Sequence, residues 1–212
     1  MPEMLKAVQT IAGRYPHRDP SDLAGIRHLI EQQTPIDEPN AEGQTAFFWA
    51  VRCDLHDIAE LLEQAGADAS CRSDGQLLSA VFSGDGDLAR LALSNGADPE
   101  RKYATMTPLE LATFHGNPDV VDALVRAGAH VSPDALAPLG EMDITDYMID
   151  SDEDERRYAR VVSTLIVNGA SPAITAFDNE PLIESFPESR YPQIHGALSA
   201  ALERANAKTR NG

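Results

Sequence analysis

The chain contains only two cysteines, Cys53 and Cys71, among its 212 residues. Two thiols are too few for a disulfide framework or for a cysteine-rich zinc site, which excludes the small disulfide-stapled domains of secreted proteins. We therefore predict two free thiols in a reducing compartment, and we expect a cytoplasmic location.

Positive charge is scarce as well. Lys and Arg number 17 against 34 Asp and Glu, so the net charge is −17, and the only lysines are Lys6, Lys102 and Lys208. Nucleic acids and anionic membranes are bound through clustered Lys and Arg, which argues against both as partners. The balance favours a basic protein partner. Cations that are mostly Arg, together with abundant Ala and Asp, are typical of a bacterial sequence of high GC content.

Long hydrophobic runs are also missing. No stretch approaches the roughly 20 apolar residues that cross a bilayer. The start, Met1–Lys6, lacks the basic and apolar segments of a signal peptide. With 42% hydrophobic and 24% charged residues, the composition predicts a globular protein with a sizeable core.

The motifs of common catalytic sites do not occur either. The sequence has no Gly-x-Ser-x-Gly elbow, no phosphate-binding Gly-x-x-x-x-Gly-Lys-Ser/Thr loop and no His-Glu-x-x-His helix. The six histidines are scattered, and of these we expect His115 to face a partner. We therefore predict no catalytic residue, no cofactor and no metal ion, and a protein that is not an enzyme.

An internal repeat runs through the chain. Tripeptides of one kind begin at Gly66, Gly96, Gly128 and Gly169, with spacings of 30, 32 and 41 residues. Each follows an apolar helix-like run, such as Val120–Val125. A glycine just past a helix end supplies the left-handed conformation that caps it. The pattern predicts a series of helix pairs.

The openings of these pairs identify a family. Thr107-Pro108-Leu109-Glu110-Leu111-Ala112 begins one pair, and Thr45-Ala46-Phe47-Phe48-Trp49-Ala50 begins an earlier one. With the mid-repeat Gly84 and Gly116, which Asp54 replaces in one unit, and the Gly-Ala-Asp ends, the chain resembles the ankyrin repeat family. The resemblance implies an all-α solenoid of about six helix-pair units, including degenerate N- and C-terminal caps, with short fingers and no true sheet.

We predict one ankyrin-repeat domain over residues 1–206. Within it, residues 1–40 form N-terminal capping helices, 41–132 regular repeats, 133–172 a repeat with an acidic insertion, and 173–206 a C-terminal cap. Residues 207–212 are expected to form a frayed tail. Terminal repeats must present a polar outer face, which explains why the caps depart from the pattern.

The insertion is strongly acidic, since eight of the fifteen residues from 141 to 155 are Asp or Glu. Insertions within a repeat usually form loops on one face, often the binding face. Asp150-x-Asp152-x-Asp154 begins like a calcium loop, but Glu155 stands where Gly is needed and Val161 where Glu is needed. An EF-hand is therefore excluded. A looser divalent-metal site, or an enzyme activity in 141–155, stays open as the alternative function.

The predicted function is a non-catalytic protein–protein interaction module. Stacked repeats present a concave face and fingers to a partner, and the chain is expected to be a monomer when free. One specific hypothesis is an immunity-type protein that inhibits a basic toxin or enzyme, and the other is a scaffold or regulator. The expected partner-binding residues lie on fingers, groove and acidic loop: Glu42, Gln44, Arg72, Asp74, Phe82, Tyr103, Met106, Phe114, His115, Asp150, Asp152, Glu153, Asp154 and Glu155.

Overall fold

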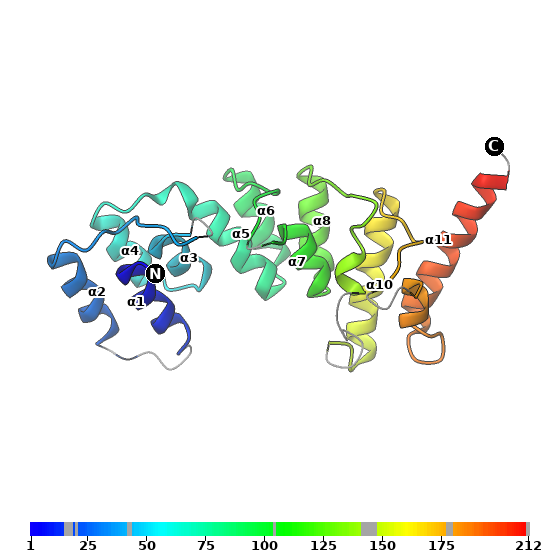
Figure 1. Ribbon diagram of the computed structural model, residues 1–212, viewed down its shortest axis with the longest axis horizontal. Coiled ribbons are helices and arrows are strands. Elements are labelled where there is room, and N and C mark those ends of the chain that lie inside the picture. The colour runs from blue at the N-terminus through cyan, green and yellow to red at the C-terminus, as the bar shows by residue number, and fades with distance from the viewer. Residues whose placement is uncertain are drawn as a thin grey trace. The chain divides into compact units, whose positions relative to one another are not determined.

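The computed structural model describes residues 1–14, 19, 21–41, 44–103, 105–140, 148–176 and 180–210. In these residues all regular secondary structure is helical, and the only β-type pairings are the isolated bridges Tyr103–Met106 and Thr175–Pro181. The helices up to residue 126 follow one another as successive pairs, and a short 3₁₀ turn precedes each of the two later helices in the described residues (Figure 1). The predicted all-α repeat solenoid is confirmed.

The chain divides into two compact units. The first comprises Met1–Ala80 and Leu91–Asp98, and the second comprises Val81–Arg90 and Pro99–Gly212. The boundary therefore passes through two helices, α5 (Arg72–Ser83) and α6 (Gly86–Ser94).

Four helices and a short turn build the rest of the first unit: α1 (Glu3–Ala12), α2 (Asp22–Glu31), α3 (Ala46–Arg52), α4 (His56–Gln64) and the 3₁₀ turn η1 (Ala69–Cys71). Helix α3 packs on both α1 and α4. Its Phe47 side chain is fully buried in a core that also contains Leu5 and Ile58. Helices α1 and α2 lie in the region 1–40 for which capping helices are predicted.

The second unit contains α7 (Pro108–Phe114), α8 (Pro118–Arg126), α10 (Asp152–Val167), α11 (Pro192–Arg210) and the 3₁₀ turns η2 (Ala137–Leu139) and η3 (Leu182–Ser185). Helix α10 packs against α8 and α11. The buried residues of the second unit include Leu124, Tyr158 and Leu198, each almost inaccessible to solvent. The backbone is helical as far as Arg210, and fraying of the chain from residue 207 stays a prediction.

The repeat glycines have the conformation that the sequence predicts. Gly66, Gly96, Gly128 and Gly169 have φ of 94°, 91°, 93° and 117°. The alanine after each donates its N–H to the carbonyl five residues earlier, as Ala97 does to Ala92 at 3.0 Å. This bond satisfies a carbonyl that the helix end leaves without a donor.

Among the residues that the structure describes, two other than glycine adopt the same left-handed backbone. Asp54, with φ of 59°, takes the mid-repeat place that Gly84 and Gly116 fill in later units. Gln33, also at 59°, takes the helix-ending place after α2. Repeat geometry thus holds even where the glycine is missing.

Two glycine substitutions test this account of the helix ends. A methyl group added at Gly96 or at Gly25 meets no other atom within 4 Å, but only Gly96 has a positive φ. Gly96→Ala should lower the free energy of unfolding by about 1 kcal/mol, because L-residues are strained in the left-handed region. Gly25→Ala, inside α2, should raise it by about 0.5–1 kcal/mol, because alanine favours helix. Urea unfolding measures both, and equal signs would contradict the account.

Candidate functional site

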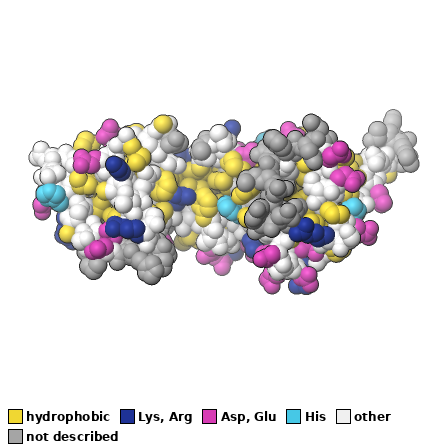
Figure 2. Space-filling model, turned by 60° about the horizontal axis from the view of Figure 1, so that its bottom comes forward, with side chains coloured by type: hydrophobic (Ala, Val, Ile, Leu, Met, Phe, Trp, Pro, Cys, Tyr) yellow, Lys and Arg dark blue, Asp and Glu magenta, His cyan; other side chains and the backbone are white. Residues whose placement is uncertain are grey.

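Three aromatic side chains form a cluster on the second unit. Phe82 lies in the last turn of α5 and is 46% exposed, whereas Phe114 ends α7 and His115 follows it. The His115 ring centroid lies 5.2 Å from that of Phe82 and 5.2 Å from that of Phe114, both edge-to-face. Figure 2 shows a face on which hydrophobic side chains are exposed between acidic ones, with a histidine among them. We call Phe82, Phe114 and His115 the ring cluster.

The imidazole of His115 contributes an uncharged ring to this cluster. The residue is half-buried, and burial lowers its pKa below the ordinary value of 6.5. A lowered pKa keeps the ring neutral at pH 7. The ring cluster is therefore an uncharged aromatic surface in a strongly acidic chain.

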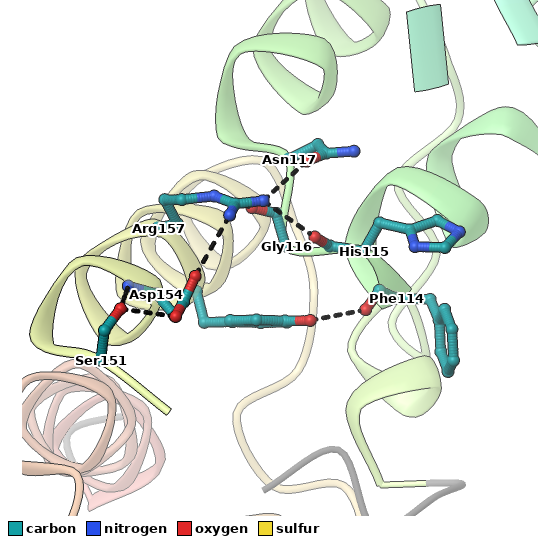
Figure 3. A network of polar contacts seen from close by, with 8 residues as sticks. Phe114, His115, Gly116, Asn117, Ser151, Asp154 and Arg157 are labelled. Atoms are coloured by element: carbon teal, nitrogen blue, oxygen red, sulfur yellow. Dashed lines mark hydrogen bonds and ion pairs between the residues drawn. The ribbon is translucent and has the colours of Figure 1, made fainter. Parts of the chain in front are cut away.

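A polar network holds the backbone under the ring cluster (Figure 3). Arg157, on α10, donates from Nε to the carbonyl of Gly116 at 3.2 Å and from Nη2 to the carbonyl of His115 at 3.2 Å. The same Nη2 donates to Oδ1 of Asn117 at 2.9 Å. Carbonyls at a helix C-terminus lack intrahelical donors, and one guanidinium supplies them here.

Two neighbours on α10 complete the network. Asp154 forms an ion pair with Arg157 at 3.2 Å, and the Ser151 hydroxyl donates to Asp154. That hydrogen bond lowers the pKa of Asp154, and Arg157 acts in the same direction. Tyr158 donates from its hydroxyl to the carbonyl of Phe114 at 2.8 Å. Burial raises the pKa of Tyr158 to about 12, so the donor proton stays in place at neutral pH.

The acidic residues 152–155 are not a loop, and in this respect the sequence interpretation was wrong. They form the first turn of α10, where Ser151 caps the helix by accepting from the N–H of Asp154 at 3.1 Å. Carboxylates are favoured at a helix N-terminus by the helix dipole. Asp150, Asp152 and Glu153 are exposed, as a partner-binding role requires.

Glu155 has a different position, because its side chain is only 5% exposed. Its Oε1 accepts from the N–H of Gln193 at 2.6 Å and from that of Ile194 at 3.4 Å, at the start of α11. The expected contact with a partner is corrected accordingly. Glu155 satisfies the open N–H groups of a neighbouring helix.

Of the predicted residues in the first unit, the three that the structure describes engage in contacts within it. Gln44 is half-buried and accepts from the indole N–H of Trp49 at 3.0 Å. Arg72 pairs with Glu63 at 2.6 Å. Asp74 is 8% exposed and accepts from the N–H of Asp98 at 2.8 Å, so it is largely withdrawn from the surface.

The finger residues Tyr103 and Met106 are joined by two backbone hydrogen bonds, the shorter of 2.8 Å. Met106 is half-buried, but Tyr103 is 7% exposed. Tyr103, expected to contact a partner, is therefore largely withdrawn from the surface, because its large apolar ring gains more from burial than from exposure. Glu42 and the acids Glu141, Asp143 and Asp146 lie outside the described residues.

Within the described part of the chain, no group of three or more His, Cys, Asp or Glu side chains is arranged to hold a metal ion. None of the helices described there is both long and apolar enough to cross a membrane.

Sequence reasoning missed the residues that organise this site. Asn117, Arg157 and Tyr158 were not singled out, although Asn117 and Tyr158 are buried. One local signal was present: Ser151-x-x-Asp154 at the start of an acidic turn is typical of a helix N-terminus. It predicts α10 but not what α10 contacts some forty residues earlier.

Comparison with known proteins agrees with this architecture. The ankyrin repeat family model matches residues 42–74 and 106–136. In these two segments the chain carries ankyrin repeats. A search of curated protein sequences finds no match.

Solved ankyrin-repeat structures match nearly the whole chain. An ankyrin repeat domain from Acinetobacter baumannii is 25% identical, with a TM-score of 0.53 over 94% of this chain and 98% of that one. A second ankyrin repeat protein is 21% identical, with a TM-score of 0.52 over 92% and 97%, and shows the fold alone. Ankyrin repeats generally mediate protein–protein interaction and are typically not enzymes.

The different positions of Glu155 and Glu153 give a direct test. Glu155→Ala should lower the free energy of unfolding by about 1–3 kcal/mol, because it leaves N–H groups at the start of α11 without an acceptor. Glu153→Ala, in the same turn but exposed, should change it by about 0.5 kcal/mol, through the helix dipole only. Chemical unfolding of both variants checks this, and an equal loss would show that Glu155 does not cap α11.

Proposed function

We propose that this ankyrin-repeat protein is a monomeric, non-catalytic module that binds a basic protein. The ring cluster of Phe82, Phe114 and His115 anchors the partner. The exposed acids Asp150, Asp152 and Glu153 attract it. The observation that carries the proposal is an uncharged aromatic cluster, with Phe82 exposed and Phe114 and His115 half-buried, on a chain with a net charge of −17.

Aromatic anchoring follows from the energetics of interfaces. Large exposed hydrophobic side chains in the described residues are few, and Phe82 is the aromatic one. Its ring packs edge-to-face on His115, so it loses little conformational freedom when a partner covers it. A few pre-organised aromatic side chains usually supply most of the binding energy of an interface.

The acidic side chains have a separate role. Charges at the rim of an interface raise the association rate and select partners of opposite charge, but they add little affinity. Such steering is strongest at low salt and is screened as the ionic strength rises. Asp154 and Glu155 are excluded from this role, because Arg157 and the start of α11 engage them.

An immunity-type role, in which the protein neutralises a basic toxin or enzyme, is the specific form of this proposal. The similar domain from Acinetobacter baumannii supports a bacterial origin for the chain. A scaffold or regulatory role would use the same surface. The alternative activity in 141–155 draws no support from the described residues 150–155, where two of the carboxylates serve contacts within the chain.

The first experiment identifies the partner and then measures binding with purified components. Tagged protein is used to recover partners from the host, and the neighbouring genes supply candidates. Each candidate is purified and titrated in solution. A basic protein that forms a defined complex supports the proposal. The proposal is overturned if only acidic partners are recovered, or if no recovered protein binds once it is purified.

Phe82→Ala should weaken the complex by about tenfold or more, mainly by faster dissociation, because a central aromatic anchor is lost. Val167→Ala is the matched control, since Val167 is an exposed hydrophobic side chain at the end of α10, outside the ring cluster. Surface plasmon resonance separates the two rates. Equal affinities for both variants would remove the ring cluster from the interface.

A second set of variants tests steering. Asp150→Asn, Asp152→Asn and Glu153→Gln together should slow association by about threefold to tenfold at low salt, with dissociation unchanged. Glu31→Gln, Glu38→Gln and Glu60→Gln remove three exposed charges from the first unit and control for net charge. If both triple variants slow association alike, the acids at the start of α10 have no special part.

A further inference from the structure

We infer that Arg157, together with Asn117 and Tyr158, positions the ring cluster, so that α10 shapes a binding surface to which it contributes no ring. The inference rests on the proposed function for its biological meaning. Its geometry stands on the contacts of the second unit alone. These three residues are positioning residues, because they act on the rings through the backbone.

The first branch of the network fixes the end of α7. Tyr158 donates to the carbonyl of Phe114, and Arg157 donates to that of His115. These carbonyls belong to the two residues whose rings lie edge-to-face. Donors at successive carbonyls set the direction in which the chain leaves the helix, and thereby the directions of the two side chains.

The second branch reaches the helix that carries Phe82. The Asn117 amide accepts from Arg157 through Oδ1 and donates through Nδ2 to the carbonyl of Val81, the residue before Phe82, at 2.6 Å. Asn117 is 5% exposed, so water does not compete effectively for these bonds. The guanidinium of Arg157 thus holds the backbone at His115 directly and the backbone beside Phe82 through Asn117, while the neighbouring Tyr158 holds the carbonyl of Phe114.

The fit around this guanidinium leaves little room for other arrangements. Gly116 has φ of 61°, and a methyl group there would lie 2.6 Å from the Tyr158 ring. Arginine offers several N–H donors in a rigid planar fork, whereas lysine offers one compact ammonium group. Lysine at 157 keeps the charge but cannot serve the carbonyls of 115 and 116 and the Asn117 amide in this geometry.

The acidic start of α10 therefore has a second use. Ser151 holds Asp154, and Asp154 holds Arg157. Part of the negative charge in this segment acts within the chain, on the direction of a cation. Asp154, which the sequence analysis assigned to the partner, thus helps to pre-organise the ring cluster.

NMR of the free protein tests the inference without any partner. The imidazole Hε1 and Cε1 signals of His115 report both the ring currents of Phe82 and Phe114 and the titration of the ring. In Arg157→Lys we expect the Hε1 signal to move towards that of an exposed histidine and the pKa to rise towards 6.5. Arg160→Lys is the matched control, since Arg160 lies on the same helix and pairs at 2.9 Å with the exposed Asp119.

Two further measurements keep this test decisive. Far-UV circular dichroism and urea unfolding establish that each variant is folded. Tyr158→Phe removes only the hydroxyl that binds the carbonyl of Phe114 and should shift the same His115 signals by a smaller amount. Unchanged His115 signals in folded Arg157→Lys and Tyr158→Phe proteins would overturn the inference, as would equal shifts in Arg160→Lys.

Binding to a purified partner separates the inference from the proposed function. Arg157→Lys should weaken the complex about fivefold to tenfold, and the effect should be smaller in a Phe82→Ala background, since residues acting through one surface couple. If the His115 signals shift as expected in the variants but no protein partner is found, the proposed function is refuted and the positioning role is not. If Phe82→Ala weakens the complex but Arg157→Lys leaves its affinity unchanged, the positioning role is refuted and the proposed function is not.

Discussion

Short helices leave many backbone carbonyls and N–H groups without partners, and satisfying these groups is the constraint on which this structure depends. Helices α3 and α7 have seven residues each, so the terminal turns make up most of their length. Left-handed residues close most of the ends, and alanine N–H groups follow in a fixed pattern. Where a left-handed turn alone does not suffice, as after α7, side chains from another helix supply the missing donors.

The same requirement accounts for part of the acidic composition. Asp37 accepts from the N–H of Asp68 at 3.0 Å, and Glu100 accepts from the N–H of His130 at 2.7 Å, each across one repeat. Glu155 does so at the start of α11. A carboxylate offers several lone pairs to N–H donors, which makes it an effective acceptor at the turns of a solenoid. The net charge of −17 therefore combines acids that stabilise the fold with acids that face solvent.

Local patterns predicted what depends on neighbouring residues. Helix-ending glycines and the capping box of Thr107 and Glu110 follow from interactions over a few residues, and the structure has them. Arg157 and Tyr158 instead act on carbonyls more than forty residues earlier. No local pattern encodes which carbonyl a side chain will meet. Tyr103 was misjudged for a related reason, since its burial depends on packing that a finger position does not reveal.

Helix α10 connects these two levels. Its first turn obeys a local rule, with Ser151 as the cap and carboxylates at the positive end of the dipole. That rule places Arg157 and Tyr158 one turn further on, facing the end of α7. The acidic segment thus forms the start of a helix, and this start positions the Arg157 guanidinium beside carbonyls that lack donors. The rings of the cluster do not contact Arg157 themselves. They are positioned because Arg157 binds the backbone and amide groups next to them, directly or through Asn117.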